Sequence, residues 1–202
     1  MPICFLVGAS PQAGDAPRIS PGDFVIAADG GLDRLRRWGV APDLVIGDMD
    51  SLSSALPFDI PCVKFPREKD ETDMALALNA GLERGFNRFE LLGAAGGRPD
   101  HTFANVQLLV KAARLGAEAT LHMGGWRCTA LCGKAALKLK GKGTVSVFAY
   151  GEKAKGVSIT GMKYRFAGEL DGAAPLGISN ELAGVGQISL EEGTLLCCWE
   201  LR

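Results

Sequence analysis

Short apolar segments alternate along this chain with segments of helical spacing, as far as residue 123. The apolar segments have the length and composition of buried strands, and most are followed at once by glycine or aspartate. The predicted strands cover residues 3–7, 24–28, 44–46, 62–65, 89–92 and 117–123. Helical patterns lie between them at residues 32–38, 74–82 and 103–113. This alternation is typical of a sheet with helices on its faces.

The pattern changes near residue 129, after which the chain has short strands and no long helical pattern. These strands are predicted at residues 144–150, 157–162, 186–190 and 194–199. We therefore predict an α/β fold with two domains. Residues 1–128 are expected to form a Rossmann-like three-layer α/β domain with a mostly parallel sheet. Residues 129–202 are expected to form a small all-β domain, sandwich-like or a half-barrel.

Two aspartates follow the third predicted strand. Asp48 and Asp50 come directly after Gly47, so the strand delivers both carboxylates to its C-terminal end, where ligands bind in open α/β sheets. Two carboxylates this close repel each other unless a cation lies between them, and Mg²⁺ accepts one or two carboxylates together with substrate phosphates. The motif indicates a metal site, but a polar turn with backbone-bonded aspartates fits it equally well.

A second aspartate, Asp29, follows the strand at residues 24–28 and precedes Gly30. Glycine lets the backbone approach a ligand closely, and the carboxylate can accept hydrogen bonds from a nucleotide. A helix cap with a tight turn explains the same two residues at least as well.

The helix predicted over residues 74–82 begins with a charged segment. Asp70 is expected at its N-cap and Asp73 three residues later, which is the spacing of a capping box. Capping alone explains both aspartates. The same helix start offers free N–H groups to a phosphate, with Lys69 beside them, so binding and capping can both hold.

A glycine-rich loop follows the strand at residues 89–92 and leads into the next helix. Arg98 lies in this loop and can hold a phosphate through two parallel hydrogen bonds. Asp100 and His101 fall in the first turn of the helix. A lone histidine is usually a surface or capping residue, but glycines, Arg, Asp and His together at a strand end favour a functional site.

Several classes of function are disfavoured. A net charge of -1 gives no general attraction to nucleic acid or anionic membranes, and no apolar run approaches the ~20 residues of a membrane span, so we expect a cytoplasmic protein. No G-x-x-x-x-G-K-[ST] motif occurs, which argues against a P-loop. The six cysteines include no C-x-x-C pair and are expected to be buried thiols rather than disulfides or zinc ligands.

The order of these motifs resembles that of the thiamine pyrophosphokinase family, and the resemblance covers essentially the whole chain, including the change to all-β structure. Its motifs are Asp-Gly-Gly at 29–31, Gly-Asp-Met-Asp-Ser at 47–51, Lys-Asp-Glu-Thr-Asp at 69–73, Gly-Gly-Arg-Pro-Asp-His at 96–101 and Gly-Ile-Ser-Asn-Glu at 177–181. Each motif alone is weak, but five in the same order are specific. Without the resemblance, the last of them reads as a turn.

The resemblance implies a homodimer that transfers the β,γ-pyrophosphoryl group of ATP to the hydroxyl of thiamine, with the active site between subunits. It implies an ATP- and Mg²⁺-binding catalytic domain at residues 1–128 and a thiamine-binding domain at residues 129–202. The implied metal ligands are Asp48, Asp50 and Asp73. The implied ATP-binding residues are Asp29, Gly30, Lys69, Asp70, Arg98 and His101. Thiamine is expected to contact Asp100, Ser179 and Asn180. The implied catalytic set is Asp48, Asp50, Asp73, Arg98 and Asp100.

Two other functions remain open. The N-terminal motifs suit another Mg²⁺-dependent phosphotransferase or phosphohydrolase equally well, and a non-catalytic nucleotide- or thiamine-binding regulator is disfavoured because a binder does not need three convergent carboxylates. The sequence does not decide the general base, for which Asp100 is favoured over Asp48. It also leaves open the aromatic that stacks on thiamine, with Trp126 and Trp199 as candidates, and the metal count, nucleotide preference and dimer geometry.

Overall fold

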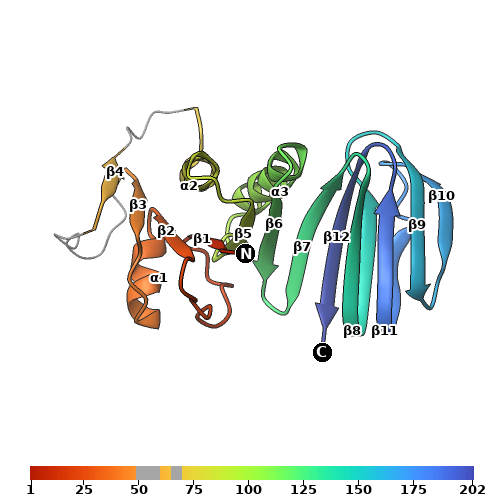
Figure 1. Ribbon diagram of the computed structural model, residues 1–202, viewed down its shortest axis with the longest axis horizontal. Coiled ribbons are helices and arrows are strands. Elements are labelled where there is room, and N and C mark those ends of the chain that lie inside the picture. Colours follow the sequence, from red (N-terminus) through yellow and green to blue (C-terminus); the bar gives the residue numbers. More distant parts are fainter. Residues whose placement is uncertain (49–59, 65–69) are drawn as a thin grey trace. The chain divides into compact units, whose positions relative to one another are not determined.

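The computed structural model describes residues 1–48, 60–64 and 70–202, which form two compact units. The first unit falls within residues 1–112 and 116–124, and the second comprises residues 113–115 and 125–202. Figure 1 labels the helices and strands of both. Within the described residues, no helix is long and apolar enough to cross a membrane.

The strands of the first unit pair in parallel, in the order β4-β3-β2-β1-β5-β6. They are β1 (Cys4–Val7), β2 (Phe24–Ala28), β3 (Leu44–Gly47), β4 (Cys62–Lys64), β5 (Arg88–Leu92) and β6 (Glu118–Met123). From β1 the chain builds outward to β4, and it then returns to the other side of β1 with β5. A reversal of this kind leaves a crevice at the carboxyl ends of the two strands that flank it.

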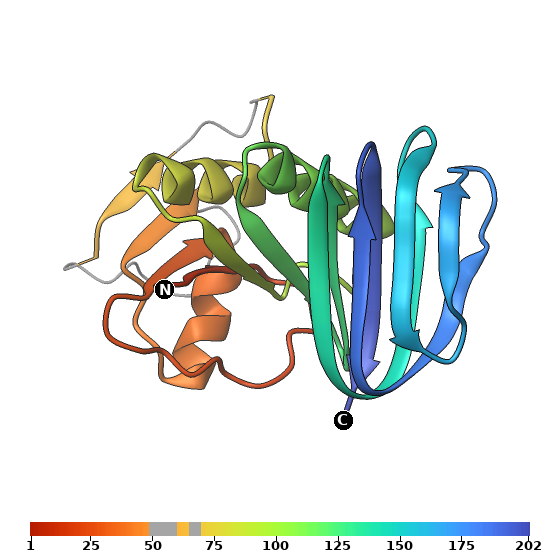
Figure 2. The ribbon, with the colours of Figure 1, turned by 45° about the vertical axis from the view of Figure 1, so that its right-hand side comes forward.

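Helices cover both faces of this sheet. They are α1 (Gly31–Trp38), α2 (Asp73–Glu83) and α3 (Pro99–Arg114). Leu32 and Leu35 of α1 share a core with Phe5. On α2, Gly81 lies against Cys4 and the Phe89 ring. Cys4 and Phe5 are successive residues of β1 and face opposite sides of the sheet, so α2 covers the face opposite α1. Figure 2 shows α1 on one face and α2 and α3 on the other.

The second unit is antiparallel throughout its described pairs, in the order β10-β9-β11-β8-β12-β7. Its strands are β7 (Trp126–Cys132), β8 (Ala135–Ala149), β9 (Ala154–Met162), β10 (Phe166–Leu170), β11 (Gly177–Leu190) and β12 (Thr194–Leu201). Taken over both units, antiparallel pairing predominates, because the longest strands, β8 and β11, lie here.

The predicted sandwich is not confirmed. Hydrogen bonds join all six strands of the second unit in one ladder, whereas a sandwich has two separate sheets. Register shifts between Gly168 and Leu170 and between Gly177 and Asn180 interrupt the pairing, and irregularities of this kind bend a sheet. An apolar core that includes Val145, Ile188 and other residues of five strands is buried within the unit.

Strand β8 is longer than the sequence interpretation proposed, because it begins at Ala135 rather than at residue 144. Lys138 and Lys140 are exposed, while Leu139 between them is buried, so the added part is a half-buried strand with alternating sides. The prediction of buried thiols also needs correction, since Cys4, Cys128 and Cys197 are buried but Cys62 is exposed.

Candidate functional site

A cavity of about 560 Å³ lies where the strand order reverses, at the carboxyl ends of β1 and β5. Its walls are the loops after β1, β2 and β5 and the first turns of α2 and α3, all within the first unit. Its polar side chains are Ser10, Asp29, Asp70, Glu71, Thr72, Asp73, Arg98, His101, Thr102 and Asn105. Two helix N-termini open onto it, and such ends carry unpaired N–H groups and partial positive charge, which suits an anion.

The loops after β1 and β5 are joined to each other along one wall of the cavity. The Ser10 N–H donates to the Gly93 carbonyl at 2.8 Å, and the Ser10 hydroxyl donates to the Ala95 carbonyl. A side chain at Gly8 would meet the Gly93 oxygen at 2.6 Å, so the two backbones approach each other more closely than any other residue at position 8 permits. This packing brings residues from distant parts of the sequence to one wall.

Asp29 combines an unusual backbone with an unsatisfied side chain. Its φ is +48°, in the left-handed region, and its N–H donates to the Ile46 carbonyl at 2.7 Å. Its Oδ1 is buried and has no hydrogen-bond partner within the described residues. A buried polar atom without a partner is costly, so an orphaned carboxylate oxygen in a cavity wall indicates where a ligand's donor or a cation arrives.

The three predicted metal ligands are described in part. Asp73 is the first residue of α2 and lines the cavity. Asp48 directly follows β3, which lies beside β2, so it shares the carboxyl edge of the sheet with Asp29. Asp50 lies outside the described residues. Among those residues, no three potential ligands are close enough together to hold a metal by themselves, so the predicted trio stays a prediction.

The residues present nevertheless fit Mg²⁺. Asp29, Asp70, Glu71 and Asp73 outnumber the basic groups Arg98 and His101 around the cavity. A polyphosphate would be repelled by this lining unless cations accompanied it, and carboxylate oxygens are the ligands that Mg²⁺ prefers. The orphaned oxygen of Asp29 is one such ligand. The carboxylates of Asp29 and Asp73 in the cavity lining would therefore contribute to holding the ion, and Asp48 lies at the same edge of the sheet, but these three described residues do not make a complete ligand set by themselves.

The N-terminus of α2 differs from the prediction. Thr72, not Asp70, is the N-cap, because its hydroxyl accepts the Ala75 N–H at 3.2 Å. Asp70 and Thr72 both line the cavity, while Lys69 lies outside the described residues. The N-cap therefore lies two residues later than predicted, and it does not require the Asp70 carboxylate.

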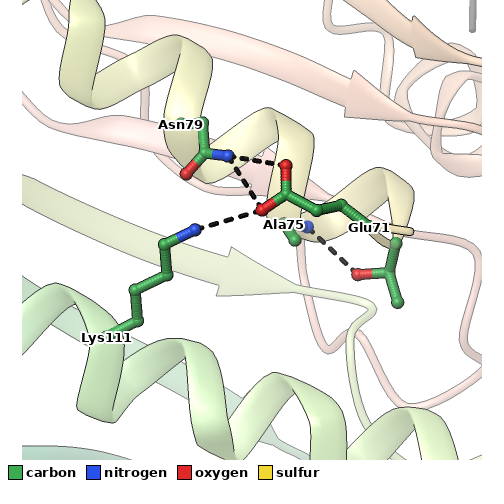
Figure 3. A network of polar contacts seen from close by, with 5 residues as sticks. Glu71, Ala75, Asn79 and Lys111 are labelled. Atoms are coloured by element: carbon green, nitrogen blue, oxygen red, sulfur yellow. Dashed lines mark hydrogen bonds and ion pairs between the residues drawn. The ribbon is translucent and has the colours of Figure 1, made fainter. Parts of the chain in front are cut away.

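Glu71 fixes this end of α2 to α3. Its carboxylate accepts from the Asn79 amide at 3.0 and 3.2 Å and from the Lys111 ammonium at 3.2 Å (Figure 3). The Asn79 hydrogen bonds, followed by those from Lys111, lower the pKa of Glu71. The charge of Glu71 is thus already paired with Lys111 of α3.

Arg98 and Asp100 form a bidentate ion pair at the start of α3. The guanidinium Nη2 and Nε lie 2.5 and 3.2 Å from the two carboxylate oxygens, and both side chains are exposed, at 72% and 60%. The hydrogen bonds from Arg98 lower the pKa of Asp100 to about 2 and raise the pKa of Arg98. Arg98 and Asp100, which the sequence placed in one site, are therefore in contact, and Arg98 and His101 both line the cavity. A carboxylate with so low a pKa is a weak proton acceptor near neutral pH.

We expect Asp100→Asn to leave the shape of the pH–rate profile unchanged between about pH 5 and 9, because a group with a pKa of about 2 has no proton to lose there. The folded-state pKa lies below the ordinary value, so the Arg98 contact is complete above about pH 4 and is lost as pH falls through about 2. Initial rates of product formation, measured between about pH 5 and 9, test this prediction. The control variant is Asp15→Asn, because the Asp15 carboxylate is exposed. An acid limb that disappears in Asp100→Asn alone would contradict it.

Two residues of the site were missed from the sequence. Arg34, within the helix predicted at residues 32–38, is only 9% exposed and donates to the carbonyls of Gly8, Ala9 and Ser10. Asn105 is also buried and donates to the Ala94 carbonyl at 2.6 Å. Both fix the loops of the cavity. For Asn105 the available signal was a polar residue near the apolar face of a predicted helix.

Ser179 and Asn180 lie in the second unit, inside β11 rather than in a turn. The Asn180 side-chain oxygen accepts the N–H groups of Tyr164 and Glu181 at 3.0 and 2.9 Å, and its amide nitrogen donates to the Tyr164 carbonyl at 2.7 Å. Ser179 has a φ of +58°, and its N–H donates to the Ser146 hydroxyl. Asn180 therefore shapes its surroundings through internal hydrogen bonds.

Two models of known protein families match this chain, one mostly within each of its two structural units. Residues 18–121 match a family model described as thiamin pyrophosphokinase, catalytic domain, and residues 136–195 match one described as thiamin pyrophosphokinase, vitamin B1 binding domain. The first match contains Asp29, Asp73 and Arg98, and the second contains Ser179 and Asn180.

Individual thiamin pyrophosphokinases are also similar to this chain in sequence and in structure. A thiamine pyrophosphokinase of Bacillus subtilis (strain 168) is 35% identical over 91 residues, an alignment that spans 43% of this chain and 42% of the relative. The crystal structure of thiamine pyrophosphokinase from Bacillus subtilis has a TM-score of 0.88 and 25% identity, with both chains fully covered. The thiamin pyrophosphokinase structure from Geobacillus thermodenitrificans has a TM-score of 0.86 and 28% identity, with 99% and 98% covered.

Proposed function

This chain belongs to the thiamin pyrophosphokinase family, and we propose that it transfers the β,γ-pyrophosphoryl group of ATP to the hydroxyl of thiamine, giving thiamine diphosphate and AMP. The observation that carries the proposal is the match of both family domains on one chain, with an acidic cavity inside the part that matches the catalytic domain. Residues 1–128 are proposed to bind ATP and Mg²⁺, and residues 129–202 to bind thiamine.

ATP is proposed to bind in the cavity between the loops that follow β1 and β5. Its phosphates face the N-termini of α2 and α3 and the Arg98 guanidinium, whose Nη1 can donate to a phosphate while Nε and Nη2 bind Asp100. Gly30, Lys69, Asp70 and His101 complete the proposed ATP-binding set with Asp29. Bound Mg²⁺ would screen the triphosphate charge and polarise the phosphate that is attacked.

In the proposed reaction the hydroxyl oxygen of thiamine attacks the β-phosphorus of ATP. The new bond forms as the bond between the β-phosphorus and the oxygen bridging to the α-phosphate breaks, and AMP leaves with that oxygen. Alignment of the two oxygens accounts for much of the catalysis in such transfers. Arg98 adds positive charge where the transition state concentrates negative charge. The hydroxyl proton must also be removed.

The proposed general base needs revision. Asp100 was favoured from sequence, but its pKa of about 2 makes it a weak acceptor while Arg98 holds it. We propose instead that Asp100 holds Arg98 in position through their ion pair and that the hydroxyl proton passes to another carboxylate of the site. Asp48 remains the second candidate.

Thiamine is proposed to bind near Ser179 and Asn180, in a pocket completed by a second copy of the chain. Support for a homodimer comes from apolar side chains beside this segment. Leu176 is 72% exposed, Ile178 48% and Tyr164 59%, and the backbone of Tyr164 is bonded to the Asn180 side chain. Such a cluster suits burial against a partner.

We expect Asn180→Ala to raise the KM for thiamine at least about tenfold and to leave the KM for ATP within about twofold, because it releases the Tyr164 backbone from two hydrogen bonds in the part that matches the vitamin B1 binding domain. Steady-state kinetics with each substrate varied in turn measure both constants. Gln187→Ala is the control, since Gln187 is an exposed amide on the same strand. Equal losses for the two substrates would argue against a thiamine-specific role.

The proposed function is tested by incubating the protein with ATP, Mg²⁺ and thiamine and separating the products by chromatography. Thiamine diphosphate and AMP are expected in equal amounts. Formation of thiamine monophosphate and ADP would identify a different kinase, and release of phosphate or pyrophosphate without a thiamine product would identify a phosphohydrolase.

A further inference from the structure

Arg34 lies beneath the junction of the two loops that form the cavity wall. From α1 its guanidinium donates to three successive carbonyls, those of Gly8 at 3.2 Å, Ala9 at 3.1 Å and Ser10 at 2.5 Å. It also packs against the other loop, because a side chain at Gly93 would come within 2.9 Å of its Nε. Arg34 does not line the cavity itself. One buried side chain thus supports both loops from behind.

The direction of these carbonyls matters for an anionic ligand. Three successive carbonyl oxygens that bond to a group outside the cavity lining are turned away from the cavity, where their partial negative charge would repel phosphate. On the other side of the same loop, the N–H groups of Gly8 and Ser10 donate to the Leu92 and Gly93 carbonyls at 2.8 Å. The loop is therefore held in one orientation from two directions.

We propose that Arg34 is a positioning residue for the nucleotide, which acts by holding the Gly8–Ser10 loop with its carbonyls turned away from the phosphates and without touching the ligand. This inference rests on the proposed use of the cavity for ATP. Arginine suits the task because its planar group presents several donors in a fixed fork, whereas the compact ammonium of lysine does not reproduce that geometry. A purely structural role would instead affect both substrates equally.

The test compares Arg34→Lys and Arg34→Ala with the wild type, each as the full chain of 202 residues. Binding of ATP with Mg²⁺, without thiamine, is measured by calorimetry, and the KM values for ATP and thiamine are measured where the protein is active. We expect ATP affinity to fall about tenfold or more in both variants, because small misplacements of positioning groups are costly, while the KM for thiamine changes less than about twofold. Guanidinium ion at low millimolar concentration should restore part of the ATP affinity of Arg34→Ala and none of that of Arg34→Lys.

The control is Arg37→Ala, which removes an exposed arginine from the same helix and should bind ATP like the wild type. ATP affinity within about twofold of the wild type in Arg34→Lys would overturn the proposal. Equal losses for ATP and thiamine, or failure of both variants to fold by circular dichroism, would also overturn it in favour of a structural role. Because the binding measurement contains no thiamine, a wild type that binds ATP but makes no thiamine diphosphate rejects the proposed reaction and still allows the role of Arg34 to be decided.

Discussion

Asp73→Asn is expected to reduce the turnover of thiamine diphosphate formation by roughly 10²-fold or more, a loss comparable to that of one preorganised electrostatic contact in an active site. Asp73 lies at the first position of α2 and lines the acidic cavity. The amide keeps the size of the side chain but removes the charge that would hold Mg²⁺, so the Mg²⁺ concentration for half-maximal rate should also rise. Initial rates over a range of Mg²⁺ concentrations measure both effects.

The matched control for Asp73→Asn is Glu83→Gln, which makes the same chemical change at an exposed position at the other end of the same helix. It should leave turnover within about twofold of the wild type, because surface substitutions away from special features have small effects. Thermal unfolding of both variants separates a loss of chemistry from a loss of structure. Wild-type turnover in Asp73→Asn would remove this residue from the proposed metal site.

Gly31→Ala should be the most destabilising single-methyl change at the site, with an expected loss of about 3 kcal/mol or more in the free energy of unfolding. A Cβ at this position would lie 1.8 Å from the Val7 carbonyl oxygen and 2.6 Å from its carbon. The first turn of α1 and the end of β1 would have to separate, which would disturb Asp29 and the loop after β1 together. Urea unfolding followed by circular dichroism gives the change.

Gly39→Ala is the comparison that isolates this clash, because Gly39 lies at the other end of α1. Gly39 has a φ of +68° and nothing within 4 Å of an added Cβ. Alanine at this position is expected to lower the free energy of unfolding only through left-handed backbone strain, by about 1–2 kcal/mol. Similar losses in the two variants would mean that β1 and α1 tolerate a wider separation than the contact at Gly31 indicates.

The sequence predicted most elements because their burial pattern is local. The strand predicted at residues 24–28 is β2 with the same bounds, and the patterns near residues 74–82 and 103–113 are α2 and α3. It missed β7, β10 and the first part of β11, and also the first half of β8, where only Leu137 and Leu139 mark the inward side among lysines. It also misplaced the N-cap of α2, because Asp70 and Thr72 are both good caps and only the helix geometry decides between them.

The candidate site was predicted as a set of residue types at strand ends, and that part requires only the rule that parallel strands present their carboxyl ends at one edge. Asp29, Arg98 and His101 were named in this way and Asp73 was named at a helix start, and all four line one cavity. The pairing of Arg98 with Asp100, which lowers the pKa of the expected base, depends on side-chain orientation at the start of α3, which no spacing in the sequence specifies.

By itself, then, the sequence determined the alternating elements, the change to all-β structure and the chemistry available at the strand ends, because each depends on neighbouring residues. Only the tertiary structure decided that β1 and β5 lie side by side at the reversal of strand order, that Ser10 reaches Ala95 across 85 positions, and that Arg34 lies beneath both loops. These contacts join residues far apart in the chain, and they form only when the whole sheet has closed around its core.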